Sequence, residues 1–243
     1  MLGSKIYEGK AKILYKNPDN DSEIYQYFKD DATAFNNQKK SVIDSKGVLN
    51  NFISEYIMLN LRNEGVNNHF IKRIDERVQL VKKLDIIPLE VIVRNYSAGS
   101  FAKRLNVPTG KELKKSVIEF CLKDDALGDP LINDYHIQAL NIASINEITH
   151  IKEVTLQIND FLLRLFKDIN IKLIDFKIEF GRSINKEIIL ADEISPDSCR
   201  LWDINTGEKM DKDRFRLDLG DLAKYYKIIA DRLNINLNEA QND

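Results

Sequence analysis

The stretch KLIDFKIEFGRSINKEIILADEI, residues 172–194, carries the clearest signal for the fold. Apolar and charged residues alternate in its first half, and a β-strand places alternate side chains on opposite faces. One face would hold Ile174, Phe176, Ile178 and Phe180, and the other Asp175, Lys177 and Glu179. The pattern predicts a strand over 172–181 with one buried face. It does not by itself indicate a site, because an ordinary strand with one face in solvent shows the same alternation.

A second apolar run follows closely enough to form a hairpin with this strand. Residues 182–186 separate the strand from the run at 187–194. If residues 185–186 form a two-residue turn, Ile184 pairs with Glu187. The sequence therefore predicts an antiparallel pair of strands in the C-terminal part of the chain.

Two acidic side chains face each other in this predicted hairpin. Continuing the register places Glu179 opposite Asp192. Directly opposed side chains lie about 5 Å apart, and two carboxylates there repel each other unless a cation lies between them. Mg²⁺ typically takes one or two carboxylates and completes its shell with water and phosphate oxygens, so we expect this pair to bind Mg²⁺ at a nucleotide site. Lys177, two residues along the same face, is the alternative cation.

Outward from this hairpin, short strand patterns alternate with amphipathic helices. Helical spacing of apolar residues predicts helices at 47–63, with Gly65 as a stop, and at 146–169. A short helix is expected to end at Leu105, and a last one to cover 219–233. Strand patterns occur at 5–7, 11–15, 23–28, 70–74, 78–84, 89–94 and 116–122. This order predicts an α+β fold with helices covering largely antiparallel sheets.

The length of the chain is compatible with a division into two lobes. A chain of 243 residues, 43% of them hydrophobic, can bury a core as one large domain or as two small lobes. No repeat, Ser/Gly linker or low-complexity block marks the boundary. We expect an N-terminal lobe over 1–85 and a C-terminal lobe over 86–243, with one cleft between them.

Charge and composition argue against several classes of partner. The net charge is −2, which removes the simplest electrostatic case for binding nucleic acid or an anionic membrane. No leader pattern opens the chain and no stretch reaches the ~20 apolar residues of a bilayer helix, so we expect a cytoplasmic protein with no membrane partner. Cys121 and Cys199 are too few for a disulfide framework or a zinc knuckle. His69, His136 and His150 show no paired spacing, so we expect no histidine metal site.

A glycine turn with two lysines near the N-terminus is a candidate phosphate-binding element. In EGKAK, residues 8–12, Gly9 lies at a strand turn, and Lys10 and Lys12 lie on one face of the second strand. Their ammonium groups can converge on one polyanion, although a solvated hairpin is the alternative because the string is neither a Walker A loop nor GxGxxG. Further candidate anion ligands, with ordinary surface positions as the alternative, are Arg94, Ser100 and Arg200.

Six strings of the chain resemble the SAICAR synthetases, the phosphoribosylaminoimidazole-succinocarboxamide synthases of purine biosynthesis. The strings are YEGKAK (7–12), DDATAFN (30–36), IPLEVIVRNYSAGS (87–100), LIDFKIEFG (173–181), ADEISPDSCRLWD (191–203) and DKDRFR (211–216). Six motifs in the family's order are far more specific than any one of them. The resemblance implies a two-lobed α+β fold with an ATP cleft similar to those of kinases and ATP-grasp enzymes.

The same resemblance implies an ATP-dependent carboxylate–amine ligase. Such an enzyme joins the carboxylate of CAIR, 5-amino-1-(5-phosphoribosyl)imidazole-4-carboxylate, to the amine of L-aspartate, and converts ATP to ADP and phosphate with Mg²⁺. A carboxylate resists attack by an amine because its charge repels the nucleophile and oxide is a poor leaving group. Phosphorylation to an acyl phosphate would supply the leaving group. Family members often form homodimers, so a homodimer is also implied.

The resemblance assigns roles to individual residues. The residues that it places at the ATP phosphates are Gly9, Lys10, Ala11 and Lys12. Those near adenine are Val81, Lys82 and Leu84, and those at the metal are Glu179 and Asp192. It places at the CAIR phosphate Arg94, Ser100 and Arg200, and at the imidazole and carboxylate the catalytic candidates Asp175 and Lys177. Loops at the imidazole or the incoming aspartate contain Lys123, Asp129, Lys212 and Arg216. We assign Arg216 to aspartate. No histidine lies in these motifs, so the expected base is a carboxylate such as Asp175 or Asp129, or bulk exchange before binding.

Two other classes share parts of this pattern. A small-molecule kinase would also use a lysine-bearing hairpin and a metal-binding carboxylate pair, and only the acceptor would differ. A regulatory nucleotide-binding module would bind ATP without turnover. Release of ADP that depends on aspartate separates the ligase from both.

Overall fold

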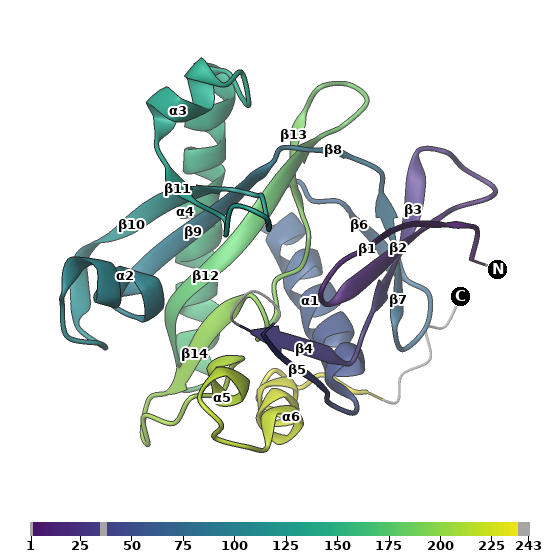
Figure 1. Cartoon of the computed structure of the whole chain (residues 1–243). Coiled ribbons are helices and arrows are strands. Elements are labelled where there is room, and N and C mark those ends of the chain that lie inside the picture. The colour runs from purple at the N-terminus through teal and green to yellow at the C-terminus, as the bar shows by residue number, and fades with distance from the viewer. Residues whose placement is uncertain (1, 35–37, 238–243) are drawn as a thin grey trace.

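The computed structural model describes residues 2–34 and 38–237 of the chain. Two antiparallel sheets lie side by side, and most of the helical mass lies behind and below them (Figure 1). The predicted α+β class is confirmed. Among the described residues, none of the helices has the length and apolar character needed to cross a membrane.

The first sheet is built by the N-terminal part of the chain. Its strands lie in the order β1-β2-β3-β7-β6. They are β1 (Lys5–Glu8), β2 (Lys12–Lys16), β3 (Glu23–Phe28), β7 (Val78–Lys82) and β6 (Phe70–Arg73). A separate two-stranded sheet, which the sequence patterns did not predict, joins β4 (Asp31–Ala34) to β5 (Lys39–Val42). The last two residues of the DDATAFN string lie outside the described residues.

The second sheet has seven strands and is centred on β12 (Ile171–Arg182). Its main path runs through β11 (Leu131–Ile132), β10 (Glu112–Leu122), β9 (Leu89–Tyr96), β12 and β13 (Ile188–Ala191). Two further strands pair with β12, namely β14 (Cys199–Asp203) and β8 (Asp85–Ile86). The expected boundary between residues 85 and 86 thus falls inside a strand of the second sheet, and the division into 1–85 and 86–243 stays a prediction.

Six helices complete the described fold. They are α1 (Lys46–Asn63), α2 (Gly99–Leu105), α3 (Asp134–Ala139), α4 (Ile145–Asp168), α5 (Asp213–Arg216) and α6 (Leu222–Arg232). The three longest agree with the sequence patterns to within three residues at each end. Gly65 follows α1 with a φ of 84°, the left-handed conformation expected of a C-terminal stop.

The long helix α4 starts at a capping box and packs against the central strand of the second sheet. The Ser144 hydroxyl accepts a bond from the Glu147 amide at 3.3 Å, and Glu147 Oε2 accepts one from the Ser144 amide at 2.7 Å. The buried side chains on its inner face include Ile148, Ile151, Ile158, Leu162 and Phe166. Each such side chain contributes about 1.5–3 kcal/mol of burial free energy, which holds α4 behind β12.

The central strand β12 is buried on both faces. Its predicted apolar face is enclosed, with Ile174, Phe176, Ile178 and Phe180 each 0–1% exposed. The acidic residues Asp175 and Glu179 on the other face are also buried, at 3% exposure each. Buried carboxylates need partners, so this face is not the ordinary solvated surface that the alternation allowed.

The predicted register of the hairpin is wrong by one residue. Glu179 pairs with Ala191 rather than with Asp192. The turn contains three residues instead of two, because the Ser183 amide donates to the Glu187 carbonyl at 2.9 Å and Lys186 adopts a left-handed φ of 64°. Asp192 is the first residue after β13 and has a φ of 61°.

Candidate functional site

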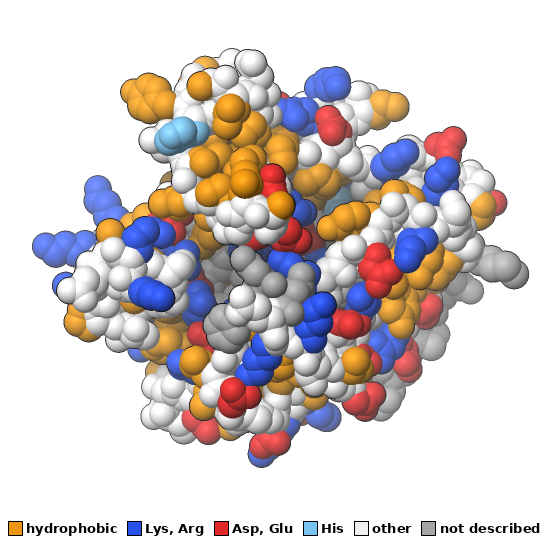
Figure 2. Space-filling view, in the orientation of Figure 1, with side chains coloured by type: hydrophobic (Ala, Val, Ile, Leu, Met, Phe, Trp, Pro, Cys, Tyr) orange, Lys and Arg blue, Asp and Glu red, His pale blue; other side chains and the backbone are white. Residues whose placement is uncertain are grey.

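A cavity of about 550 Å³ is lined by residues of both sheets. Acidic and basic side chains gather near the centre of this face of the molecule (Figure 2). All the residues proposed from the sequence line this cavity: Gly9, Lys10, Ala11, Lys12, Val81, Lys82, Leu84, Arg94, Ser100, Lys123, Asp129, Asp175, Lys177, Glu179, Asp192, Arg200, Lys212 and Arg216. Residues from distant parts of the chain therefore meet at one place, although their individual roles stay predictions.

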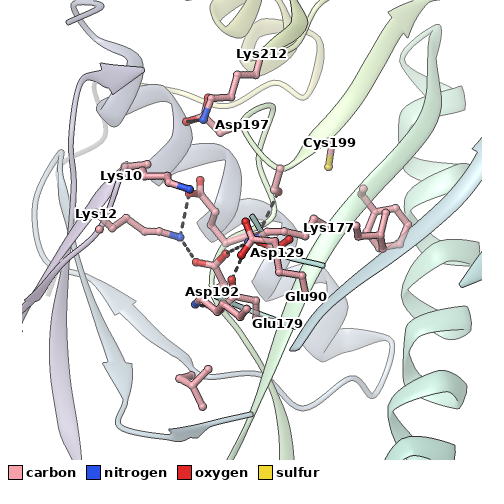
Figure 3. A pocket seen from close by; sticks show the side chains of 18 of the residues that line it. Lys10, Lys12, Glu90, Asp129, Lys177, Glu179, Asp192, Asp197, Cys199 and Lys212 are labelled. Carbon is pink, nitrogen blue, oxygen red and sulfur yellow. Dashed lines mark hydrogen bonds and ion pairs between the residues drawn. The ribbon is translucent and has the colours of Figure 1, made fainter. Parts of the chain in front are cut away.

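The glycine turn between β1 and β2 brings two lysines to the cavity. The turn is closed by the Gly9 amide, which donates to the Lys12 carbonyl at 2.8 Å. Lys10 Nζ lies 2.7 Å from Asp125 Oδ1, across the cavity. Lys12 Nζ bonds to Asp192 and lies 3.0 Å from Glu193 Oε1 (Figure 3). The turn is thus tied to acidic residues of the C-terminal half of the chain.

Three carboxylates converge on the ammonium group of Lys177 (Figure 3). Lys177 Nζ lies 2.7 Å from Glu179 Oε1, 3.2 Å from Glu90 Oε1 and 3.5 Å from Asp192 Oδ2. Lys123 Nζ donates to the other oxygen of Glu179 at 2.5 Å. The alternative cation considered for the acidic pair, Lys177, is the one that contacts both of its members here.

Electrostatic interactions keep Lys177 and Asp192 charged. Burial alone would lower the pKa of Lys177, but the carboxylates of Glu179, Asp192 and Glu90 outweigh it and raise that pKa well above its usual value. Burial alone would raise the pKa of Asp192, but Lys12 and Lys177 hold it well below its usual value. Asp192 is therefore an anion at neutral pH, which is the form that a cation or a lysine requires.

The donor atoms of the acidic pair suit a divalent cation. Glu179 and Asp192 present carboxylate oxygens, the ligands that Mg²⁺ prefers, and both lie within 3.5 Å of one cationic atom. Across residues 2–34 and 38–237, no group of three or more His, Cys, Asp or Glu side chains is placed to hold a metal ion. Two protein carboxylates suffice for Mg²⁺ when phosphate oxygens and water complete the shell.

A row of charged side chains crosses three strands on the other side of the cavity. Asp175 on β12 pairs with Arg94 on β9 and with Arg200 on β14. Asp175 Oδ2 accepts bonds from Arg94 Nη1 at 2.6 Å and from Arg200 Nη1 at 2.8 Å. Arg94 Nη2 also donates to Ser100 Oγ at 3.2 Å. The carboxylate thus aligns two guanidinium groups, an arrangement that suits binding of a phosphate or carboxylate.

A glycine is required where the second of these arginines approaches the backbone. Gly99 begins α2 with a φ of 51°. A Cβ atom added there would lie 2.5 Å from Arg200 Nη2. Any other residue at this position would be strained and would displace the guanidinium group.

The remaining loop residues reach the cavity from two segments. Arg216 Nη1 donates to Asp213 Oδ1 at 2.6 Å, and Arg200 Nε donates to the other oxygen of that carboxylate at 2.9 Å. Burial lowers the pKa of Lys212, whose Nζ lies 4.0 Å from Asp197 Oδ2. Asp129 Oδ1 accepts a bond from the Asp124 amide at 3.0 Å, so this carboxylate also fixes its own loop.

Several cavity residues were missed by the sequence patterns. They include His69, Glu90, Glu193, Asp197 and Ser198. Alternation along β9 puts Glu90 on the same face as Arg94, so this signal was available. Glu193 and Asp197 lie inside a string already quoted for the family. His69 has no such signal, and its Nε2 lies 2.8 Å from the Asp192 carbonyl oxygen.

Comparison with known proteins identifies the family of this chain. The sequence model of the SAICAR synthetase family matches residues 5–233. The chain belongs to this family. It is 56% identical over 243 residues to the phosphoribosylaminoimidazole-succinocarboxamide synthase of Pelagibacter ubique (strain HTCC1062), a match that covers 99% of the chain and 93% of the relative.

Solved structures of SAICAR synthetases have the same fold. The crystal structure of phosphoribosylaminoimidazole-succinocarboxamide synthase from Ehrlichia chaffeensis superposes with a TM-score of 0.94 at 47% identity, covering 96% of this chain and 99% of that one. A SAICAR synthetase (type-2) in complex with ADP superposes with a TM-score of 0.92 at 45% identity, again covering 96% and 99%. The family and the fold expected from the six strings are therefore confirmed.

Proposed function

We propose that this chain is an ATP-dependent ligase that joins the carboxylate of CAIR to the amine of L-aspartate. The products are SAICAR, ADP and phosphate, in de novo purine biosynthesis. Membership of the SAICAR synthetase family supports the reaction, as does the ADP complex of a relative that is 45% identical. The observation that carries the proposal is the single cavity in which the lysine turn, the acidic pair and the arginine row meet.

The lysine turn and the acidic pair form the proposed ATP end of the cavity. Gly9, Lys10, Ala11 and Lys12 would contact the phosphates, and further along the cavity wall the residues near adenine would be Val81, Lys82 and Leu84. Glu179 and Asp192 would hold Mg²⁺. The ion, when bound, neutralises charge on the phosphates, and phosphoryl transfer depends mostly on such neutralisation and on positioning.

The arginine row forms the proposed CAIR end. Arg94, Arg200 and Ser100 would bind its phosphate. Asp175 would keep the two guanidinium groups aligned. The CAIR phosphate would bind to the same two groups as this carboxylate. Lys177 lies two residues further along β12, where its ammonium group can stabilise negative charge at the reacting carboxylate. Lys123, Asp129 and Lys212 would lie near the imidazole or the aspartate, and Arg216 near the aspartate.

The reaction would proceed in two displacements. An oxygen of the CAIR carboxylate attacks the γ-phosphorus of ATP, the bond to the bridging oxygen breaks, and ADP leaves. The aspartate amine then attacks the acyl carbon, the C–O bond to phosphate breaks, and the nitrogen loses a proton. Two carboxylates that line the cavity, Asp175 and Asp129, are candidates for the proton acceptor. Exclusion of water protects the acyl phosphate from hydrolysis.

The decisive experiment supplies the purified protein with ATP, CAIR and one amino acid at a time. We expect release of ADP and formation of an amide product with L-aspartate and with no other amino acid. Phosphorylation of CAIR that proceeds equally without any amino acid would indicate a kinase. Binding of ATP without turnover would indicate a regulatory module.

The same family membership supports a proposal for the assembly and location of the protein. We propose a cytoplasmic homodimer with no nucleic-acid or membrane partner. Light scattering coupled to size-exclusion chromatography measures the mass, and a value of twice 28.1 kDa is expected. A value of 28.1 kDa at micromolar concentration would overturn the dimer without affecting the proposed reaction.

A further inference from the structure

One side chain in the wall of the cavity has unused hydrogen-bonding capacity. Gln26 on β3 lines the cavity and is only 3% exposed. Its amide makes no hydrogen bond to the described part of the chain, and its Nε2 is fully enclosed there without a partner. Oε1 is therefore the end of the amide that faces the cavity. A buried amide without partners costs free energy, so its place in a ligand cavity points to a ligand as the missing partner.

The position of Gln26 along the sheet relates it to the lysine turn. Lys12 pairs with Phe28 across β2 and β3, and Leu14 pairs with Gln26 two residues further along. Two residues along a strand correspond to about 7 Å. Because side chains two residues apart share a face, Gln26 follows Lys12 on the cavity side of the sheet. Val81, proposed to lie near adenine, pairs with Ile24, two residues beyond Gln26, so a nucleotide with its phosphates at Lys12 and its base at Val81 would pass Gln26.

The surroundings of Gln26 are apolar. Leu14, Ile24 and Val81 line the cavity around it, from β2, β3 and β7. Aliphatic walls suit the faces of a nucleobase rather than a phosphate. A single neutral amide among them suits one polar atom on the edge of the base.

A second glutamine lies directly opposite Gln26 in the sheet. Gln79 on β7 is the direct cross-strand partner of Gln26. Gln79 Nε2 donates to the Asn51 carbonyl at 3.0 Å, which leaves Gln79 Oε1 as a buried acceptor without a partner. Gln26 Nε2 and Gln79 Oε1 are thus a buried donor and a buried acceptor, each without a partner, on directly opposed residues. Because Nε2 is enclosed, the atom of this amide that Gln26 can present to the cavity is Oε1, an acceptor.

We propose that Gln26 is a specificity-determining residue that accepts a hydrogen bond from the exocyclic amine of adenine. The inference rests on the proposed function, because it requires ATP in this cavity. Guanine carries a carbonyl at the corresponding ring position, and two acceptors facing each other would leave both unpaired and desolvated. Such unpaired groups are the basis on which a polar site rejects an analogue.

The test compares ADP with an analogue that differs from it only at this position of the base, and with GDP. Isothermal titration calorimetry would measure the dissociation constants of ADP, GDP and purine riboside 5′-diphosphate, which has hydrogen in place of the amine. For the unaltered protein we expect ADP to bind about 3- to 10-fold more tightly than the purine riboside analogue, the range of one neutral hydrogen bond. Equal affinities would overturn the proposal without any variant.

A variant shows whether Gln26 is the partner of the amine. Gln26→Leu has similar volume and no acceptor, and we expect it to bind ADP and the purine riboside analogue with equal affinity. The preference for ADP over GDP should fall by a similar factor. If the variant weakens ADP and the analogue equally, the role of Gln26 is structural and the proposal is wrong. Absence of ADP binding to the unaltered protein would overturn the proposed function itself, and this inference with it.

Discussion

Replacement of Lys177 by methionine removes the ammonium group that holds three carboxylates together. Glu179, Glu90 and Asp192 lie 2.7, 3.2 and 3.5 Å from its Nζ. Methionine retains most of the aliphatic volume of the lysine. The variant therefore tests the charge, with little change in packing.

The expected loss of stability follows from the partners that remain. Removal of one member of a buried ion pair costs about 3–5 kcal/mol. Here Glu179 keeps Lys123 and Asp192 keeps Lys12, and the Lys177 side chain is 29% exposed. These factors reduce the expected loss to about 2 kcal/mol. For a chain of this size, that corresponds to a decrease in Tm of about 4–8 °C.

Calorimetry with and without Mg²⁺ measures both the loss of stability and its reversal by the cation. Without the Lys177 ammonium group, the acidic cluster attracts a divalent cation more strongly. Millimolar Mg²⁺ should therefore reverse at least half of the decrease in Tm, and it should raise the Tm of the unaltered protein less. Lys172→Met, on the same strand but outside the cavity, is the matched control and should show neither effect. A Lys177→Met variant with an unchanged Tm, or with no response to Mg²⁺, would refute the reasoning.

Three other perturbations test separate parts of the structure. Lys12→Ala should raise the KM for ATP at least tenfold and the KM for CAIR much less, in steady-state assays; an equal rise in both would contradict the division of the cavity. Burial lowers the pKa of His69 to about 4 from 6.5, so only the unfolded chain binds its proton between these pH values, and stability falls as pH decreases through this window. His69→Gln should flatten the decrease in the free energy of unfolding, measured by urea denaturation between pH 7 and 4.5. An unchanged slope of this free energy against pH would rule out His69 as its source. Gly99→Ala should raise the KM for CAIR and leave that for ATP nearly unchanged, because the new Cβ displaces Arg200; normal kinetics would show that the guanidinium position does not matter.

Local patterns in the sequence predicted local structure well. The alternation along 172–181 identified β12 and its enclosed apolar face, and the helical spacings located α1 and α4. The register of the hairpin failed because it depends on one backbone angle, the left-handed φ of Lys186, which nothing in the local pattern specifies. One extra residue in the turn was enough to shift the pairing of Glu179 from Asp192 to Ala191.

Contacts between distant parts of the chain could be predicted only through the family resemblance. Lys12 and Asp192 are 180 residues apart, and no periodicity within either strand connects them. Local patterns had already proposed residues such as Lys12 and Asp192, and the resemblance added others such as Arg216. Glu90 was missed although simple alternation from Arg94 places it there. The choice between Lys177 and Mg²⁺ as the cation of the acidic pair depends on side-chain positions, and sequence patterns carry none of that information.

The most direct test of the account follows an oxygen atom through the reaction. CAIR labelled with ¹⁸O in its carboxylate is converted with ATP and L-aspartate, and the released phosphate is analysed by mass spectrometry. Activation of the carboxylate by ATP predicts that each phosphate carries one ¹⁸O atom from CAIR. Phosphate without label, formed together with the amide product, would contradict activation of the CAIR carboxylate by ATP.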